Sequence, residues 1–382
     1  MDILVIGAGY AGLTTALRLD RTHRITLISA DSSFRQRIRM HELAAGRPGV
    51  TIPLAELTRG TGIATVQARV SGIDLQARRV RTDDGRVFPY DTLVYALGSG
   101  TDVSAPGVAE HAYTAETAAE LRTRLEGSGG RVAVVGGGLT GVEMAAELAE
   151  SYPSWQVALV TGGEPGAGLS GKGRRHLART LTRLGVRTHA GTRATGAGPG
   201  VVRTDRGDVA ADVVVWAASF VVPPLAAEAG LAVDSRGRAL VDETLRSVSH
   251  PEVYVVGDAA AVRVPGGTSR MSCAAGMPIA AHAADVVNAR AAGRAARPFR
   301  FRYLIQCVSL GRRDGLIQFV RADDSPVEWI LSGQVAAWVK ELVCRFTVGS
   351  LRLERRRPGS YLWVKGSSRP SSAQVKASSS AA

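Results

Sequence analysis

The chain has 382 residues, enough for two or three domains with sizeable cores, and 45% hydrophobic and 21% charged residues, which is ordinary for an α/β protein. No uncharged apolar run reaches the 18 residues of a membrane-spanning helix, and the three cysteines lack metal-like spacing, so we expect neither a transmembrane segment nor a metal site. The formal net charge of +13 would suit nucleic acid, an acidic membrane surface or an anionic substrate, but an arginine-rich solvated surface explains it more simply, and we expect no nucleic-acid binding.

The chain opens on an apolar run at residues 3–6 that predicts a strand. Only two residues precede this run, which leaves no room for a signal peptide and favours the cytoplasm. The run leads into Gly7-Ala8-Gly9-Tyr10-Ala11-Gly12, then into a helical pattern, and then into a second apolar strand at residues 25–28. This order predicts a βαβ unit built around a dinucleotide-binding turn.

A second unit of the same kind begins about 130 residues later, with a strand at 132–135, the turn Gly136-Gly137-Gly138-Leu139-Thr140-Gly141, a helix, and a strand at 157–160. In such turns the first glycine permits a tight bend, the second lets backbone approach a pyrophosphate, and the third lets the helix pack on the strand. The helix N-terminus then offers N–H groups to the phosphates. Residues 166–171 repeat the glycine spacing, but a loop precedes them instead of a strand, and we reject them as a site.

The segments around these units follow a repeated order of strand and linker. A buried strand at 87–95 ends in Ala96-Leu97-Gly98, a linker at 102–106 follows, and residues 114–125 predict a helix. A strand at 212–219 repeats the small-residue exit of the earlier strand, and residues 247–251 form a second linker. These features indicate an internal half-repeat of nucleotide-binding units.

The last third of the chain contains a strand that ends in Gly257-Asp258. A carboxylate beside a glycine can accept hydrogen bonds from ligand hydroxyls, and a helix N-cap is the plainer interpretation of Asp258. Helices are predicted at 271–292 and, with an amphipathic pattern, at 334–347, and a strand begins within 306–313. The Ser/Ala-rich residues 367–382 are predicted to be disordered.

Taken in order, the stretches GAGYAG, YALG, GGGLTGVE and YVVGDA resemble flavoproteins with two dinucleotide-binding domains, the pyridine nucleotide-disulfide oxidoreductase superfamily. The GLTGVE stretch is most similar to the branch of type II NADH dehydrogenases and apoptosis-inducing-factor-like flavoproteins. The resemblance covers residues 1 to about 315. It implies an α/β fold of two Rossmann-like domains, the second inserted in the first, plus a small C-terminal region.

The resemblance implies FAD on the first turn and NADH or NADPH, as co-substrate, on the second. It divides the chain into an FAD-binding domain at 1–105 and 246–298, an NAD(P)H-binding domain at 106–245, and a C-terminal domain at 299–366. The residues expected at FAD are Gly7, Gly9, Tyr10, Ala11, Gly12, Ser29, Asp31, Arg39, Ala96, Gly98, Gly257 and Asp258. Those expected at NAD(P)H are Gly136, Gly138, Leu139, Thr140, Gly141, Glu143, Thr161 and Ala217.

The sequence departs from the family pattern in two respects. The ribose-binding acid usual at the end of each second strand is replaced by Ser29 and Thr161, with Asp31 and Glu164 as the nearest substitutes, so NADPH stays open beside NADH. The redox-active cysteine pair is also absent, because residues 32–46 contain no cysteine. We therefore expect electrons to leave the flavin directly for an outside acceptor.

The sequence gives conflicting indications about a membrane quinone. Met277-Pro278 stands where type II dehydrogenases carry paired glutamines, which weakens the quinone interpretation. The amphipathic helix at 334–347, with Val335, Val339, Leu342, Val343 and Phe346 on one face, lies in a basic C-terminal segment and could rest on the inner face of the membrane. Packing against the FAD domain, or against a second copy in a homodimer, is the alternative, because Lys340, Glu341 and Arg345 interrupt the segment.

The function that follows is hydride transfer from NAD(P)H through FAD to a small external acceptor, quinone-like or other. His41, Glu42 and His282 are candidate proton donors, with packing or a helix surface as the plainer alternatives. Arg35, Arg37 and Arg39 are candidate anion contacts, and a surface position is the simpler interpretation for at least two of them. Two other functions stay open: a flavin-dependent oxidase or tailoring enzyme, and a flavoprotein whose reduction switches the binding of a partner.

Overall fold

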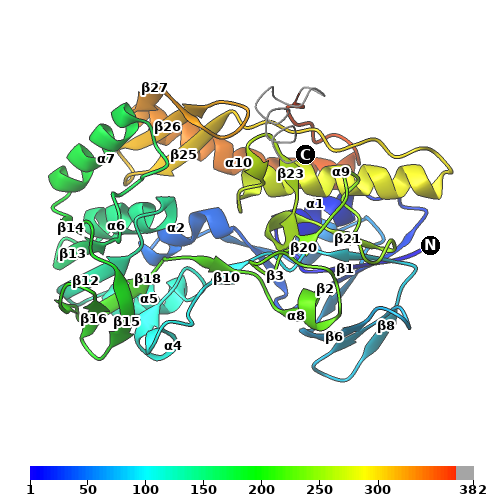
Figure 1. Ribbon diagram of the computed structural model, residues 1–382, viewed down its shortest axis with the longest axis horizontal. Coiled ribbons are helices and arrows are strands. Elements are labelled where there is room, and N and C mark those ends of the chain that lie inside the picture. The colour runs from blue at the N-terminus through cyan, green and yellow to red at the C-terminus, as the bar shows by residue number, and fades with distance from the viewer. Residues whose placement is uncertain (367–382) are drawn as a thin grey trace, which may run out of the picture.

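The computed structural model describes residues 1–366, so the tail predicted at 367–382 lies outside the described residues. Two five-stranded parallel sheets organise the chain, each at the centre of one domain (Figure 1). The first has the order β21-β9-β1-β2-β5 and the second the order β11-β18-β12-β13-β14. The predicted α/β class with two nucleotide-binding folds is confirmed.

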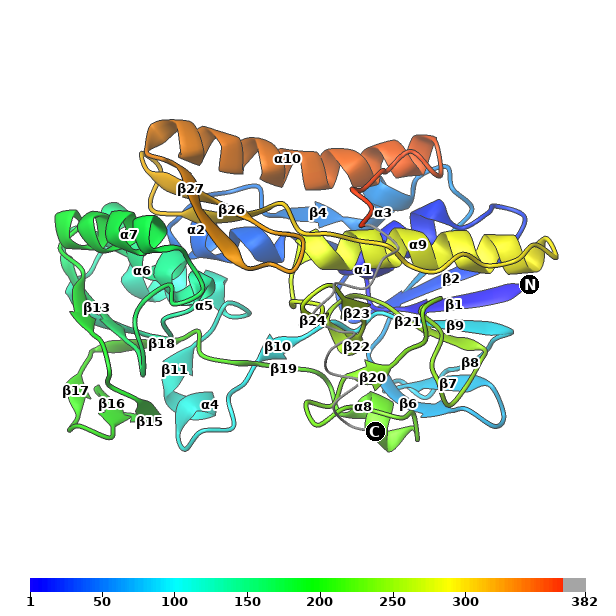
Figure 2. The same ribbon diagram turned by 45° about the horizontal axis from the view of Figure 1, so that its top comes forward.

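The first sheet takes β21 from a part of the chain far beyond its other strands. Its strands are β1 (Asp2–Ile6), β2 (Arg24–Ser29), β5 (Ala64–Gln67), β9 (Thr92–Tyr95) and β21 (Val253–Val255). Helices α1 (Tyr10–Arg18) and α9 (Cys273–Ala291) lie against one face, and the antiparallel β6 (Val70–Asp74), β7 (Arg79–Thr82) and β8 (Val87–Pro89) lie on the other (Figure 2). Because both faces are covered, strands such as β9 and β21 are buried at every position, and Thr92 is the one residue of the two strands without a large hydrophobic side chain.

The second sheet repeats this plan. Its strands are β11 (Ala112–Tyr113), β12 (Gly130–Val135), β13 (Trp155–Val160), β14 (Arg187–His189) and β18 (Val213–Trp216). The helices of this domain are α4 (Val108–His111), α5 (Ala118–Leu125), α6 (Leu139–Ser151) and α7 (Gly171–Arg183), and its antiparallel strands are β15 (Ala194–Gly198), β16 (Val201–Thr204) and β17 (Val209–Ala210). Each glycine turn lies where the first strand of its unit meets the first helix.

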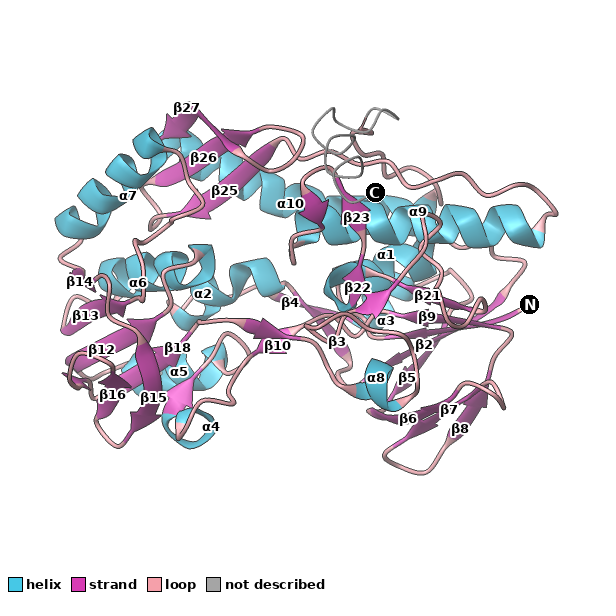
Figure 3. Cartoon of the chain, viewed as in Figure 1, coloured by secondary structure: helices cyan, strands magenta, loops and turns pink. Residues whose placement is uncertain are grey.

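Two short antiparallel strands join the domains: β10 (Gly100–Thr101) leaves the first domain and β19 (Phe220–Val221) returns to it (Figure 3). The return comes earlier than the predicted boundary at residue 245. Leu225, Leu231 and Leu245 are buried in the core of the first sheet, so the segment after β19 belongs to the first domain. The sequence offered no sign of this, because the segment is irregular and carries no motif.

Short elements complete the first domain. They are β3 (Ser33–Arg35), η1 (Arg37–Arg39), α2 (Met40–Ala44), β4 (Thr51–Pro53), α3 (Leu54–Thr58), α8 (Leu225–Glu228), β20 (Ala239–Leu240), η2 (Gly257–Ala259), β22 (Ala260–Ala261), β23 (Arg263–Val264) and β24 (Gly267–Thr268). Among these, α2 reaches towards α5 and α6 of the second domain. The first domain therefore contributes residues to the junction between the two sheets.

The C-terminal unit bridges both domains with the antiparallel β25 (Ile305–Ser309), β26 (Gly315–Val320) and β27 (Pro326–Ser332) and the long helix α10 (Gln334–Arg356). On the second domain, the buried Gln318 accepts a hydrogen bond from the Ser170 amide at 2.9 Å, and the Glu328 carboxylate accepts from the first two amides of α7. On the first domain, Glu354 near the end of α10 pairs with the buried Arg18 of α1 at 2.7 Å. Helix α10 thus lies across both domains (Figure 2).

Helix α10 presents its apolar side to solvent. Of the predicted face, Val335 is 59% exposed, Leu342 44% and Phe346 60%, and Trp338 beside them is 64% exposed. The buried side mixes apolar, small and polar residues, namely Ala336, Cys344, Thr347, Val348, Ser350, Leu351 and Glu354, and Lys340 is almost covered beside Glu143. The expected packing against the first domain is nevertheless present, but it is made by Val348 and Leu351 later in the helix, which are buried in the core of that domain. Of the charges that interrupt the sequence pattern, Lys340 and Glu341 pair with Glu143 and Arg39, whereas Arg345 is exposed.

Candidate functional site

The first glycine turn has a different requirement at each of its three glycines. Gly7 has φ of +97°, a conformation that favours glycine. A Cβ at Gly12 would lie 1.8 Å from the Gly7 carbonyl oxygen, so helix and turn touch only because that position has no side chain. Gly9 has an ordinary φ of −76° and faces open space, with nothing within 4 Å of an added Cβ. Its lack of a side chain leaves room for something outside the protein, which fits the pyrophosphate of a dinucleotide.

The second turn reproduces this geometry. Gly136 has φ of +124°, and a Cβ at Gly141 would lie 2.0 Å from the Gly136 carbonyl oxygen. Gly138 has φ of −71° and faces open space. In both turns the glycine just before the helix, Gly9 or Gly138, thus leaves an open space that a side chain would fill. We call this space the cradle; it lies at the helix N-terminus, where backbone N–H groups favour an anion.

Asp258 lies close to the first turn through its neighbour Gly257. Gly257 has φ of +73° and contacts Ala11, because a Cβ there would come within 2.9 Å of the alanine methyl. The Ser99 hydroxyl donates to Asp258 at 2.7 Å, and burial raises the pKa of the carboxyl group. Ala96 also packs on the turn, with its carbonyl oxygen opposite Gly7, and Gly98 follows with φ of +66°. The tertiary structure thus gathers three predicted segments around one cradle.

Other residues predicted at the first site lie in less direct positions. The Tyr10 ring is buried edge-on against Phe34, 4.9 Å between ring centroids, so only its backbone can face a cofactor. Ser29 and Asp31 lie at the end of β2, where the Ser29 hydroxyl accepts from the Asp31 amide and the Asp31 carboxylate pairs with Arg35 at 3.0 Å. An acid is thus present at the strand end, two residues later than usual.

The three arginines of the segment after β2 do not act together. The Arg39 side chain is 11% exposed, and its guanidinium pairs with Glu42 at 2.8 Å and with Glu341 of α10 at 2.9 Å. It is therefore used between protein carboxylates, contrary to the predicted contact with FAD. Arg37 instead reaches the crossing between the domains, where it pairs with Glu116 at 2.9 Å, donates to the Ser99 carbonyl and lies over the Phe220 ring.

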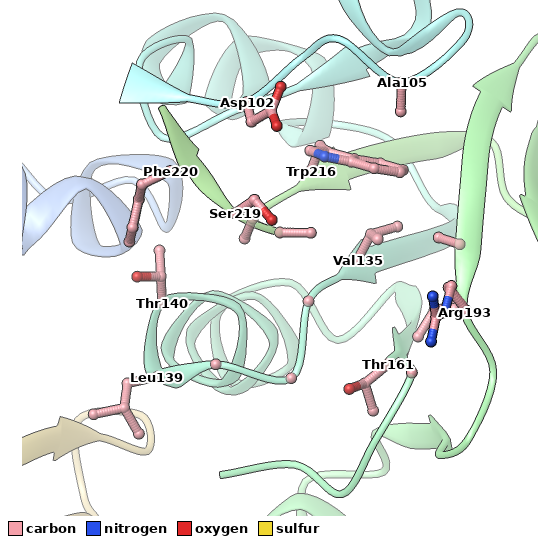
Figure 4. A pocket seen from close by; sticks show the side chains of 18 of the residues that line it. Asp102, Ala105, Val135, Leu139, Thr140, Thr161, Arg193, Trp216, Ser219 and Phe220 are labelled. Carbon is pink, nitrogen blue, oxygen red and sulfur yellow. The ribbon is translucent and has the colours of Figure 1, made fainter. Parts of the chain in front are cut away.

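A cavity of about 500 Å³ opens beside the second turn (Figure 4). The predicted Gly136, Gly138, Leu139, Thr140, Thr161 and Ala217 all line it. The sequence reasoning missed Arg193, Trp216 and Phe220, which also line it. Trp216 and Phe220 lie at the end of β18 and in the returning strand, a position that the small-residue exit after β18 could have indicated, whereas Arg193 comes from a loop with no motif.

Glu143, predicted to contact the nucleotide, faces the C-terminal unit. Its carboxylate accepts from the Ser309 amide at 2.9 Å and from the Lys340 ammonium group, and the His41 Nδ1 atom lies 3.9 Å away. Burial would lower the pKa of Lys340, but the charge of Glu143 raises it above its ordinary value, so the lysine stays protonated. The predicted nucleotide contact is thus replaced by a buried ion pair between the second domain and α10.

His41 and Glu42 belong to the same junction. Burial, reinforced by the charge of Lys340, lowers the pKa of His41 to about 3, so the imidazole is neutral near pH 7. Glu42 is 5% exposed, and Arg39 and Arg312 lie at 2.8 and 3.2 Å from its carboxylate, which contradicts the alternative of a helix-surface position. Glu42, Arg312, Lys340, Glu341 and Trp338 line a second cavity of about 250 Å³.

His282 lies apart from this junction. Its Nε2 atom is 2.9 Å from the Arg297 carbonyl oxygen, and its ring packs against Phe299 and Trp363. These contacts agree with the alternative that His282 is a packing residue, and the geometry gives no support to a role as proton donor.

All three cysteines are free, and burial raises the pKa of Cys273 to about 12 and of Cys307 to about 11, so neither carries a reactive thiolate near neutral pH.

Within residues 1–366 no helix is both long and apolar enough to cross a membrane. The same part of the chain contains no cluster of three or more His, Cys, Asp or Glu side chains that could hold a metal ion.

Residues 1–286 match the family described as pyridine nucleotide-disulphide oxidoreductase. The chain belongs to this family. An NADH dehydrogenase-like protein of Mycobacterium tuberculosis is 33% identical over 324 residues, which cover 75% of this chain and 80% of that protein. The type II NADH:quinone oxidoreductase of Staphylococcus aureus is 26% identical over 408 residues, covering 92% and 96%.

Among solved structures, NDH2 from Plasmodium falciparum in complex with NADH superimposes with a TM-score of 0.77 over 94% of this chain and 99% of that one. At 14% identity this likeness concerns the fold alone. Together with the family match, the relatives identify the protein as an NADH dehydrogenase-like, NAD(P)H-dependent flavin oxidoreductase. The predicted enzyme class is confirmed.

Proposed function

We propose that this protein transfers electrons from NAD(P)H through FAD to a quinone-like acceptor at a membrane surface. The observation that carries the electron-transfer part is the matched pair of open cradles at Gly9 and Gly138, on two parallel sheets joined by crossing strands. The acceptor is inferred from relatives, one of which is named a NADH:quinone oxidoreductase.

The residues of the first domain suit FAD. The open backbone at Gly9 and the N-terminus of α1 can receive the pyrophosphate, and the partly buried Asp258 can accept hydroxyl hydrogen bonds. When bound, the flavin supplies the hydride and electron-transfer chemistry that side chains lack. The protein's contribution is to hold two nucleotides in place, which makes the encounter of their reactive rings effectively unimolecular.

The second domain suits a nicotinamide dinucleotide that comes and goes. Its turn opens into a cavity of about 500 Å³, with Leu139 and Thr140 at one end and Thr161 at the other (Figure 4). Gly138 lets the pyrophosphate approach the N-terminus of α6.

The acceptor approaches along α10 in this proposal. Trp338 is 64% exposed on the apolar stripe, and together with Lys340 it lines the cavity of about 250 Å³. An apolar ring can therefore move from an apolar surface towards a protonated lysine. Because Glu143 keeps Lys340 charged, the lysine offers a positive charge to an acceptor that becomes anionic on reduction.

The same stripe supports binding at the surface of a lipid bilayer. Val335, Trp338, Leu342 and Phe346 project outward, and the exposed Arg345 and Arg352 lie along the same helix. An apolar face bordered by basic residues suits the boundary of an anionic membrane. A second copy of the chain is the competing partner for this face.

Anaerobic mixing of the purified holoprotein with NADH or NADPH tests the electron-transfer part. We expect the flavin absorbance to bleach, and then steady turnover with a short-chain ubiquinone. If neither nucleotide bleaches the flavin, the proposal is wrong; bleaching without quinone turnover contradicts the acceptor alone.

Flotation with vesicles of mixed zwitterionic and anionic phospholipids tests the surface. We expect wild type to float and the double variant Trp338→Ser/Phe346→Ser to stay behind, whereas Val87→Ser, a change at a similarly exposed residue of β8, floats like wild type. Light scattering on the same variants separates the alternative, because loss of a dimer without any vesicle binding of wild type would identify a twin subunit as the partner.

A further inference from the structure

We propose that Arg193 and Thr161 form a binding site for the 2′-phosphate of NADPH, so that NADPH is the preferred electron donor. The inference rests on the proposed role of the second domain as a nicotinamide dinucleotide site. It goes beyond that role by naming the phosphate that is recognised and the side chain that recognises it.

The end of β13 is the position that distinguishes the two nucleotides in this fold. In an NADH site an acid there binds the ribose 2′-hydroxyl, whereas an NADPH site lacks the acid and places an arginine nearby. Here the position holds Thr161, 7% exposed, with its hydroxyl at the cavity and 3.4 Å from the Gly163 amide. Glu164, the nearest acid in sequence, does not line the cavity.

Arg193 stands beside this position. It comes from the loop between β14 and β15 and lies next to Thr161 in the cavity wall (Figure 4). Gly162 is its direct neighbour, since an added Cβ at Gly162 would lie 3.7 Å from the Arg193 Cβ atom, an ordinary van der Waals contact. Among the described residues that line the cavity, the charged ones are Arg193 and Asp102. Asp102 lies in the segment after β10 and caps the Ser104 amide at 3.0 Å.

The backbone of Arg193 is held while its guanidinium group is available. The Asp205 carboxylate accepts from the Arg193 amide at 2.9 Å, the Asp205 amide donates to the Arg193 carbonyl at 3.0 Å, and the Thr192 amide donates to the Thr161 carbonyl at 2.9 Å. Within residues 1–366 the guanidinium takes part in no ion pair and no hydrogen bond, unlike the paired Arg37, Arg39 and Arg312. A fixed loop that carries an unpaired guanidinium to the ribose end of a nucleotide cavity suits a dianionic phosphate.

A second arginine adds positive charge at this end. Arg206 approaches Gly191, two residues before Arg193, with its Nη atoms 3.8 Å from where a Cβ of that glycine would lie. It does not line the cavity, so we assign it a contribution to the local potential and assign the direct contact to Arg193.

Equilibrium binding to the purified holoprotein tests the assignment without any electron transfer. The probes are 2′,5′-ADP and 5′-AMP, which differ only in the 2′-phosphate. A charge-assisted contact predicts at least tenfold tighter binding of 2′,5′-ADP by wild type. Arg193→Ala should abolish this preference and leave 5′-AMP affinity within about threefold, Arg193→Lys should retain part of it, and Thr161→Glu should reverse it.

Arg187→Ala is the matched control, because it removes an exposed arginine from β14 outside the cavity and should change nothing. Equal affinity of wild type for the two probes, or an unchanged preference in Arg193→Ala, overturns the inference. The outcome is separable from the proposed function: if 2′,5′-ADP is preferred but neither nucleotide reduces the flavin, the phosphate site stands and the electron-transfer proposal fails.

Discussion

Gly138→Ala should weaken nucleotide binding without loss of stability, whereas Gly141→Ala should destabilise the fold, although the two glycines stand three residues apart in one turn. Gly138 has φ of −71° and ψ of 173°, which alanine adopts freely, and an added Cβ meets nothing within 4 Å. Gly138→Ala should therefore leave the fold intact or stabilise it by about 0.4–1 kcal/mol through the unfolded chain. The added methyl group should instead occupy the space of the pyrophosphate. An overpacking cost of about 1–3 kcal/mol would weaken nucleotide binding about 5- to 150-fold.

Gly141→Ala places a Cβ 2.0 Å from the Gly136 carbonyl oxygen, a backbone atom that cannot rotate away. Helix α6 must shift from β12, which we expect to cost about 3 kcal/mol or more. Thermal unfolding and ADP-ribose binding by calorimetry distinguish the two variants, with flavin absorbance as the measure of an intact first domain.

Gly72→Ala is the control, since Gly72 also faces open space but lies in β6, remote from both turns. It should leave both stability and binding near wild type. Undiminished ADP-ribose binding by Gly138→Ala, or equal melting temperatures for the Gly138 and Gly141 variants, would refute the assignment of the cradle.

Three further predictions concern the buried charges. His41 has a pKa of about 3 in the folded protein, so near pH 6.5 it takes up a proton only when the chain is unfolded. The free energy of unfolding should therefore fall as the pH drops below 6.5, by up to about 1.4 kcal/mol per pH unit. In urea titrations at pH 7 and pH 5, His41→Gln should flatten this decline. Lys340→Met leaves Glu143 buried without a cationic partner and should lower the free energy of unfolding by about 3–5 kcal/mol in chemical denaturation. The double variant Lys340→Met/Glu143→Gln should recover most of this stability. A double variant as unstable as the single one would contradict the pairing. Arg18→Leu removes the cationic partner of Glu354, whose side chain is 1% exposed, and should likewise lower the free energy of unfolding by about 3–5 kcal/mol. It should also speed proteolysis at the end of α10. Unchanged proteolysis would count against the role of this pair in fixing the end of the helix.

The nucleotide turns were readable from local sequence because each is a continuous stretch in which strand, bend and helix follow one another. The requirement for glycine at positions 7 and 136 is a backbone property, and Gly12 and Gly141 meet a carbonyl only five residues away. The order of the motifs along the chain was enough to predict two sheets and a returning strand.

Only the tertiary structure decided the direction in which charged and apolar side chains point. Helical spacing revealed an apolar stripe on α10, but whether it faces the core or the solvent depends on the opposite side, where Lys340 meets Glu143 across 197 residues of sequence. Glu143 was assigned to a cofactor because of its place in a motif, and Arg39 because of its place in the segment of His41 and Glu42; a lysine and a glutamate from distant α10 engage them instead. The position of Arg193 beside Thr161 likewise arises from the meeting of two loops. A single sequence shows what lies within a few residues, whereas electrostatic partners are set by proximity in space. In this protein that proximity places Arg193 at the cavity of the second domain and leaves the apolar face of α10 exposed.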